Sequence, residues 1–270
     1  MSKRILTCCL VLMFMAFAGS IWAGTEGASN NFYGTGAGSS MSGGVDETFM
    51  GAYAGYKTTT GSDNTFLGYE AGYNNTDGYY NNFSGFEAGF SNTIGYYNNF
   101  FGYQAGYSNT TGNSNNFIGF DAGFYNTTGY DNNFSGFQAG LSNTIERNNT
   151  LIGYSADIDG TTPGTVTNST AIGNKAYVSQ ANSLVLGSIA GVNYATSSVN
   201  VGIGTSAPVR QLHLVGSNAV FRMDRTADTA AFMLVRTDGS GNPQKTFVVG
   251  ANSSGSGVGT FVIKDLGTAV

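Results

Sequence analysis

The stretch Asn81-Asn82-Phe83-Ser84-Gly85-Phe86-Glu87-Ala88-Gly89-Phe90-Ser91-Asn92-Thr93-Ile94-Gly95-Tyr96-Tyr97 is one of eight successive copies of a 17-residue pattern between residues 30 and 165. No copy contains an insertion relative to its neighbours. Each copy has a large apolar residue, a Gly two positions later and an Ala three positions after that Gly. The best conserved columns are Phe66, Phe83, Phe100, Phe117 and Phe134, and Ala71, Ala88, Ala105, Ala122 and Ala139.

A strict period of this length is typical of a solenoid, in which each repeat stacks on the next. Each copy contains several Gly, Asn and Thr residues and no stretch rich in Leu, Glu or Lys, and each interior Gly costs a helix about 1 kcal/mol. Short apolar runs between Gly and Asn turn signals favour strands. We therefore predict an all-β fold, a β-solenoid with two strands of about five residues and two turns per coil.

Stacking gives each column a predicted role. The Phe column is expected to fill the core, and the Ala column to face a space too narrow for a larger side chain. The Gly column is expected where the backbone needs a positive φ or approaches another backbone closely. A further column is expected to form hydrogen bonds between amide side chains along the stack; it consists of Asn75, Asn92, Asn109, Asn126 and Asn143.

Each copy also has apolar residues at two neighbouring positions, as in Phe100-Phe101 and Phe117-Ile118. Neighbouring residues of a strand point to opposite faces, so one side chain of each pair points away from the core. An additional aromatic column adds to this outward apolar surface, which is large for a monomer. We expect copies of the chain to associate, most simply as a homotrimer. That column is Tyr56, Tyr73, Phe90, Tyr107 and Phe124.

The N-terminus predicts export. Residues 1–23 have a basic start and a short apolar run followed by small residues, which is typical of a cleaved signal peptide, and residues 24–29 form a short lead-in. We expect a secreted or cell-surface protein whose mature chain does not insert into a membrane. The formal net charge is −5, and the repeats have no Lys/Arg cluster that would bind phosphates, so nucleic acid is not an expected partner.

The spacing changes after residue 165. Asn168-Ser169-Thr170-Ala171-Ile172-Gly173-Asn174-Lys175-Ala176 is followed by Asn182-Ser183-Leu184-Val185-Leu186-Gly187. This stretch resembles the head repeat of trimeric autotransporter adhesins, the YadA-like head. The resemblance implies a left-handed β-roll with three chains side by side. It extends from residues 166–207, as irregular head coils, back over the 17-residue copies of residues 30–165.

A second resemblance follows. Val201-Gly202-Ile203-Gly204-Thr205-Ser206-Ala207-Pro208, together with Leu212-His213-Leu214, is similar to a junction found in phage tail fibres and related surface fibres. The 17-residue period is absent from residues 208–270, where short apolar runs alternate with Gly, Asn and Ser. We expect a small β-rich segment there, either a domain of its own or a truncated piece of a trimeric stalk.

Few residues suggest chemistry. Asp157 and Asp159 resemble the opening of a calcium-binding loop but lack its later acidic ligand, and a turn at the end of the repeats is the simpler interpretation. His213 is the single His, with no second ligand or nucleophile near it in the sequence. We expect no enzyme activity, no cofactor and no metal site.

The leading functional prediction is a non-enzymatic adhesin or fibre that attaches to a host or environmental surface through a repetitive rod. One alternative is a carbohydrate-binding module, in which exposed tyrosines stack on sugar rings. The tyrosines concerned are Tyr79, Tyr80, Tyr96, Tyr97 and Tyr130. Another alternative is binding to ice or a mineral through a threonine column, whose hydroxyls also suit turn hydrogen bonds. That column is Thr59, Thr76, Thr93, Thr110, Thr127 and Thr144.

Overall fold

The computed structural model describes residues 29–217, 229–237, 243–252 and 260–265, and its regular elements are all β-strands. The predicted signal peptide and residues 24–28 lie outside the described residues. The chain divides into two compact units, Met1–His213 and Leu214–Val270. The first unit contains the repeats.

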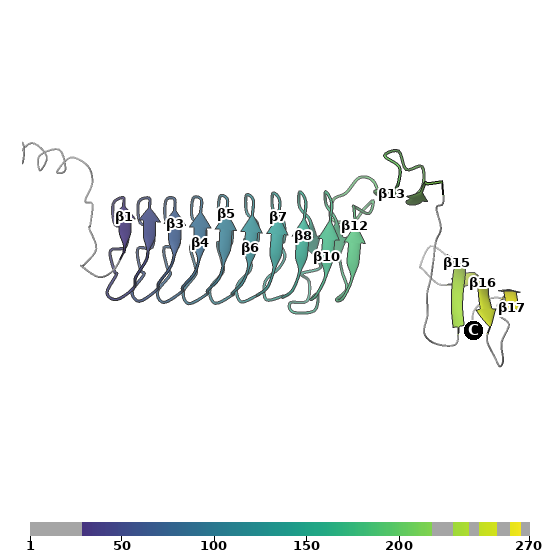
Figure 1. Ribbon diagram of the computed structural model, residues 1–270, viewed down its shortest axis with the longest axis horizontal. Coiled ribbons are helices and arrows are strands. Elements are labelled where there is room, and N and C mark those ends of the chain that lie inside the picture. Colours follow the sequence, from purple (N-terminus) through teal and green to yellow (C-terminus); the bar gives the residue numbers. More distant parts are fainter. Residues whose placement is uncertain (1–28, 218–228, 238–242, 253–259, 266–270) are drawn as a thin grey trace, which may run out of the picture. The chain divides into compact units, whose positions relative to one another are not determined.

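The eight repeats and the irregular coils that follow them form one parallel sheet of ten strands that stand side by side along a rod (Figure 1). Successive strands pair in register, so that Phe66 lies opposite Phe83 and Phe83 opposite Phe100. At a strand spacing of about 4.8 Å, ten strands span roughly 43 Å. This architecture confirms the predicted all-β solenoid. In order, the strands are β1 (Asn31–Tyr33), β2 (Thr48–Met50), β3 (Thr65–Leu67), β4 (Asn82–Ser84), β5 (Asn99–Phe101), β6 (Asn116–Ile118), β7 (Asn133–Ser135), β8 (Thr150–Ile152), β10 (Thr170–Ile172) and β12 (Leu184–Leu186).

Three smaller sheets complete the described elements. Strand β9 (Asp157–Ile158) pairs in parallel with β11 (Tyr177–Val178), and β13 (Val201–Ile203) pairs with β14 (Leu212–Leu214). The second unit contains an antiparallel sheet of three strands. These are β15 (Thr229–Thr237), β16 (Pro243–Asn252) and β17 (Thr260–Asp265).

The prediction of two five-residue strands in each 17-residue coil was wrong. In coils β1 to β7 each repeat has one strand of three residues, and the rest of the coil consists of turns and bends. The reason is backbone conformation, because left-handed residues interrupt the extended chain soon after each strand. In the coil of β3, φ is +142° at Gly68, +54° at Glu70 and +61° at Gly72. Neighbouring coils still hydrogen bond across this part, as from the Gly72 amide to the Ala88 carbonyl.

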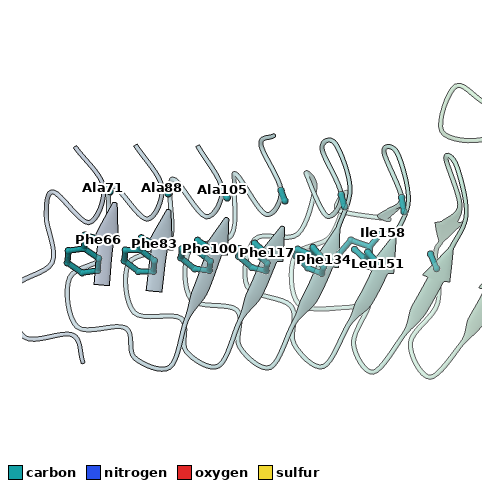
Figure 2. Close-up of a cluster of buried hydrophobic side chains, with 14 of the residues drawn as sticks. Phe66, Ala71, Phe83, Ala88, Phe100, Ala105, Phe117, Phe134, Leu151 and Ile158 are labelled. Atoms are coloured by element: carbon teal, nitrogen blue, oxygen red, sulfur yellow. The ribbon is translucent and has the colours of Figure 1, made fainter. Parts of the chain in front are cut away.

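The core is a single stack of rings flanked by methyl groups (Figure 2). The Phe column and the Ala column are both fully buried from coil to coil, as predicted. Neighbouring Phe rings lie nearly parallel, with centroids 4.9 Å apart for both Phe66–Phe83 and Phe100–Phe117. Each ring therefore packs against the ring above and the ring below, which makes the core continuous along the rod.

The core changes where the repeat becomes irregular. Strand β8 has Leu151 in place of Phe, and Ile158 enters the interior beside it (Figure 2). Strand β10 then has Ala171 at the same register position. Ile158 is fully buried, so it fills part of the volume that a Phe ring occupies in earlier coils. The resulting coil steps are 20 residues from β8 to β10 and 14 residues from β10 to β12.

The predicted asparagine ladder is present. The Asn92 Nδ2 donates to Asn75 Oδ1 at 2.7 Å, and the Asn109 Nδ2 donates to Asn92 Oδ1 at 2.9 Å. The bonds continue through Asn126 and Asn143. All five amides are buried. Since an unsatisfied buried amide is costly, the ladder makes each coil depend on the next.

A second buried ladder had not been predicted. It lies two residues before the Phe column and includes Asn64, Asn81 and Asn98. The Asn64 Oδ1 accepts a hydrogen bond from the Asn81 backbone amide at 2.9 Å, and the Asn64 Nδ2 donates to the Gly78 carbonyl at 2.8 Å. The same two bonds recur down to Asn149, so these side chains link the backbones of successive coils.

The first ladder suggests a stabilising substitution. Thr58 occupies the position one coil before Asn75, where it is fully buried, and its Oγ1 finds no hydrogen-bond partner among the described residues. Thr58→Asn extends the ladder by one amide and is expected to increase the free energy of unfolding by about 1 kcal/mol. Chemical denaturation followed by circular dichroism measures the change. Thr111→Asn, at an exposed position, is the control, and a less stable Thr58→Asn variant would contradict the expectation.

Candidate functional site

The outward side chains of the strands form an exposed apolar lane, as predicted from the paired apolar residues. Phe101 and Ile118 are 37% and 42% exposed, whereas the preceding Phe100 and Phe117 are fully buried. Ser occupies this lane in two coils, at Ser84 and Ser135. The lane comprises Tyr33, Met50, Leu67, Ser84, Phe101, Ile118, Ser135, Ile152, Ile172 and Leu186.

A second exposed lane follows the first in each coil, one Gly later in the sequence, and it had not been predicted. Its rings stack along the rod, with centroids 5.1 Å apart for Phe86–Tyr103 and 4.8 Å apart for Tyr103–Phe120. The recurrence of an aromatic residue three positions after the buried Phe was the signal available in the sequence. The lane comprises Tyr69, Phe86, Tyr103, Phe120, Phe137 and Tyr154, all exposed.

We call these two lanes together the apolar strip. None of its side chains is charged. A large side chain has a surface of roughly 200 Å², and about 40% of it is exposed for most strip residues, so the strip presents on the order of 1,000 Å². That exceeds the usual patch on a monomer and matches the roughly 800 Å² that each partner contributes to a stable protein interface.

The aromatic column that begins at Tyr56 was predicted to add to this surface. Its side chains are half buried, and their rings also stack along the rod. Tyr56, Tyr73 and Phe90 follow one another with ring centroids 5.1 and 5.2 Å apart. The Lys57 Nζ lies 5.3 Å from the centroid of the Tyr73 ring. Burial of its ring raises the pKa of Tyr107, a member of the same column.

Four of the five predicted sugar-binding tyrosines come together in one cluster. Tyr79 stacks on Tyr96 with centroids 5.0 Å apart, and Tyr80 stacks on Tyr97 at 5.2 Å. The two pairs meet edge to face, as between Tyr96 and Tyr97. Tyr80 and Tyr97 are about half exposed. Because the rings cover one another inside each pair, sugar rings have access only to the outer faces of the pairs.

The fifth tyrosine, Tyr130, lies in the same lane as Tyr96 but two coils further along. The Arg147 guanidinium lies over its ring, with the Arg147 Cζ 5.7 Å from the ring centroid. At the other end of the cluster, the nearby Asp63 carboxylate raises the pKa of Tyr80. The cluster therefore has a carboxylate neighbour, and Tyr130 has a guanidinium neighbour.

The threonine column is occupied by bonds within the rod. The Thr76 hydroxyl donates to the Thr93 carbonyl at 3.1 Å, and the Thr93 hydroxyl donates to the Thr110 carbonyl at 3.0 Å. These side chains are half buried. Their hydroxyl protons therefore satisfy the backbone of the next coil, whereas the turn interpretation of this column expected bonds within one turn.

Asp157 and Asp159 bond to protein donors separately. The Asp157 carboxylate is buried and accepts hydrogen bonds from the Ser142 amide, the Ser142 hydroxyl and the Ile158 amide. Burial raises the pKa of Asp157 to about 6, whereas a hydrogen bond from Thr161 lowers the pKa of Asp159. In the described part of the chain, no three His, Cys, Asp or Glu side chains gather in a group that would hold a metal ion.

One buried carboxylate stands in the second asparagine ladder. Glu47 replaces Asn one coil before Asn64 and is fully buried. Its Oε2 accepts the Asn64 backbone amide at 2.8 Å, and its Oε1 accepts the Asn64 Nδ2 at 2.9 Å. Burial raises the pKa of Glu47 to about 8, since these two hydrogen bonds only partly replace hydration.

Comparison with known proteins adds no relative. No family model matches the chain, and no curated protein or solved structure matches it either. The resemblances to YadA-like heads and to tail-fibre junctions thus stay predictions. Among the described residues, no helix is long and apolar enough to cross a bilayer.

Proposed function

We propose that the chain is a non-enzymatic extracellular fibre, an adhesin shaft or head, whose rods associate side by side into a homotrimer. The apolar strip carries this proposal. It is uncharged, continuous from coil to coil and large enough for a stable interface. Export through residues 1–23 would place the fibre outside the cell.

A second copy of the chain is the partner that best fits the strip. The second lane of the strip presents an aromatic ring about every 4.8 Å, the strand spacing of a sheet, from Tyr69 to Tyr154. A partner that buries the whole strip must present apolar groups with the same repeat. Another rod of this chain has the same repeat, because its sequence is identical. Association about a three-fold axis would cover the strip of every copy at once.

Such a fibre would act by repetition. Once the strips are covered, the other faces of each coil remain outside, and each face recurs along the rod. Many weak contacts to a surface then combine through multivalency, so that attachment needs no deep binding site. This interpretation assigns the repeats the work of attachment and requires no reacting group.

The molar mass in solution tests the proposal. We expect light scattering of the chain without residues 1–23 to give three times the monomer mass. Phe101→Ser together with Ile118→Ser is expected to shift the protein toward monomer, because both side chains belong to the strip. Serine is tolerated in this lane at Ser84 and Ser135, so the substitutions preserve the coil.

Tyr125→Ser is the matched control, since Tyr125 is 53% exposed but lies outside the strip. Circular dichroism of each variant would verify that the rod is intact. A wild-type protein with the mass of one chain would contradict the proposal, and so would a folded double variant that still forms the wild-type oligomer.

Glycan binding is a second candidate function, favoured by the exposed tyrosine cluster. Aromatic surface is exposed on the rod by Tyr79, Tyr80, Tyr96 and Tyr97. In the sequence of each coil these positions are separate from those of the apolar strip. The threonine column gains no such support, because its hydroxyls donate to backbone carbonyls.

A further inference from the structure

One lane of the rod contains an interrupted aromatic stack. Tyr79, Tyr96, Asn113, Tyr130 and Arg147 follow one another at intervals of one coil. Tyr79 covers one face of Tyr96, with the ring planes 1° from parallel, and Arg147 covers one face of Tyr130. Asn113 stands one coil after Tyr96 and one coil before Tyr130, so we call its position the Asn113 interruption.

The interruption has the thickness of one ring. Two coil steps separate Tyr96 from Tyr130, which places the rings about 10 Å apart at a strand spacing of 4.7–4.9 Å. The stacked rings of this rod are 4.7 to 5.2 Å apart. A ring inserted above Asn113 would therefore stack at the usual distance on both Tyr96 and Tyr130. Asn113 has a short side chain and does not provide that ring itself.

Polar groups adjoin the interruption. Ser114 follows Asn113 and donates from its hydroxyl to the Asn113 Oδ1 at 3.3 Å. Asp131 follows Tyr130, and its backbone amide donates to the Asn113 carbonyl at 3.1 Å. Ser114 and Asp131 are exposed. The amide and hydroxyl can donate and accept hydrogen bonds, and the carboxylate accepts them from hydroxyl groups.

We propose that the Asn113 interruption binds one neutral hexose residue of a glycan, stacked between Tyr96 and Tyr130. A pyranose has two apolar CH faces for the rings and a rim of hydroxyls for Asn113, Ser114 and Asp131. An aromatic side chain has no such rim. The Asp131 carboxylate and the net charge of −5 disfavour an anionic sugar. The proposal rests on the second candidate function, glycan binding.

Filling the interruption tests this proposal. Asn113→Tyr continues the lane with the residue that stands one coil before and one coil after it, so the variant is expected to fold. An array of neutral glycans, followed by calorimetric titration of the full chain with cellohexaose, maltohexaose and the best array ligand, measures binding. We expect the wild type to bind and Asn113→Tyr to reduce the affinity at least tenfold.

Ser108→Tyr is the matched control, because it adds a tyrosine to the same turn region at a lane position where Tyr125 stands naturally. It is expected to bind like the wild type. Tyr130→Ala removes one wall and is expected to weaken binding.

Two outcomes would overturn the inference, and they differ. If the wild type binds a glycan and Asn113→Tyr binds it equally well, glycan binding stands but takes place elsewhere. If no neutral glycan on the array binds, both the interruption and the second candidate function fail. The oligomeric fibre is tested separately by its mass, so neither outcome decides it.

Discussion

Replacing Gly102 with alanine is expected to disrupt the middle of the rod, at a cost of about 4 kcal/mol or more in the free energy of unfolding. The φ angle of Gly102 is +140°, a conformation that residues with a side chain rarely adopt. A Cβ at this position would lie 2.3 Å from the Gly119 carbonyl oxygen of the next coil. The backbone strain of the positive φ and the steric clash of the Cβ therefore both destabilise the folded rod.

The neighbouring coil cannot move away from the clash without losing its own bonds. The Gly119 amide donates to the Phe101 carbonyl at 2.8 Å, and the Gly119 carbonyl belongs to the backbone that approaches Gly102. A shift at this point would also separate Phe100 from Phe117, whose rings are in contact. The damage is thus expected to spread to both adjacent coils, as nearest-neighbour coupling in a solenoid implies.

Thermal and chemical unfolding followed by circular dichroism measure the effect. Gly43→Ala is the matched control, because Gly43 has no positive φ and the nearest atom to a Cβ there is 3.8 Å away. The control is expected to change stability by less than about 0.5 kcal/mol. A Gly102→Ala variant with the same melting temperature and denaturation midpoint as the wild type would show that the coils do not approach each other as closely as described.

The rod is expected to lose stability as the pH rises from 5 to 9, because of Glu47. Its pKa is raised from 4.5 to about 8, so the folded chain binds the proton more tightly than the unfolded chain. The stabilisation is complete below pH 4.5 and is lost progressively as the pH rises through 8. By linkage, such a shift corresponds to about 5 kcal/mol at pH 9.

Burial explains why the neutral form is favoured. An ionised carboxylate loses its hydration inside the rod, and the two hydrogen bonds that Glu47 accepts from Asn64 only partly replace it. The negative charges of Asp63 and Asp46 raise the pKa of Glu47 further.

Melting temperatures at pH 5, 7 and 9 measure this dependence, with Glu47→Gln as the decisive variant. We expect Glu47→Gln to resemble the wild type at pH 5 and to be more stable at pH 9. Asp157 acts in the same direction between about pH 4 and 6, whereas the lowered pKa values of Asp77 and Asp159 matter only below pH 4. Equal melting temperatures for wild type and Glu47→Gln at pH 9 would refute the assignment.

Residues with a positive φ explain why some parts of the candidate sites could not be predicted from the sequence. The period predicts that Phe83 lies above Phe66, since equal spacing places equal residues in one column. It does not predict on which side Phe86 lies, because Gly85 has a φ of +151° and ends the simple alternation of faces. The second lane of the apolar strip and the short strands both follow from this interruption.

Isolated departures from the repeat could be seen in the sequence but not interpreted there. Glu47, Thr58 and Asn113 each replace the usual residue of a column. Only the structure shows that Glu47 and Thr58 are fully buried, and that Asn113 follows the stacked Tyr79–Tyr96 pair. Burial decides their effects, since a carboxylate or hydroxyl that is harmless in water is costly in the core.

The sequence by itself determined the coil length, the all-β solenoid, the buried Phe and Ala columns and one asparagine ladder. The reason is that coils of equal length stack so that each residue lies against the equivalent residue of the next coil. Only the tertiary structure decided how each coil is divided between strand and turn, which aromatic residues are exposed and which polar groups are buried. These depend on where left-handed residues turn the chain, and a repeat in sequence fixes the stacking of coils but not the path of the backbone within one coil.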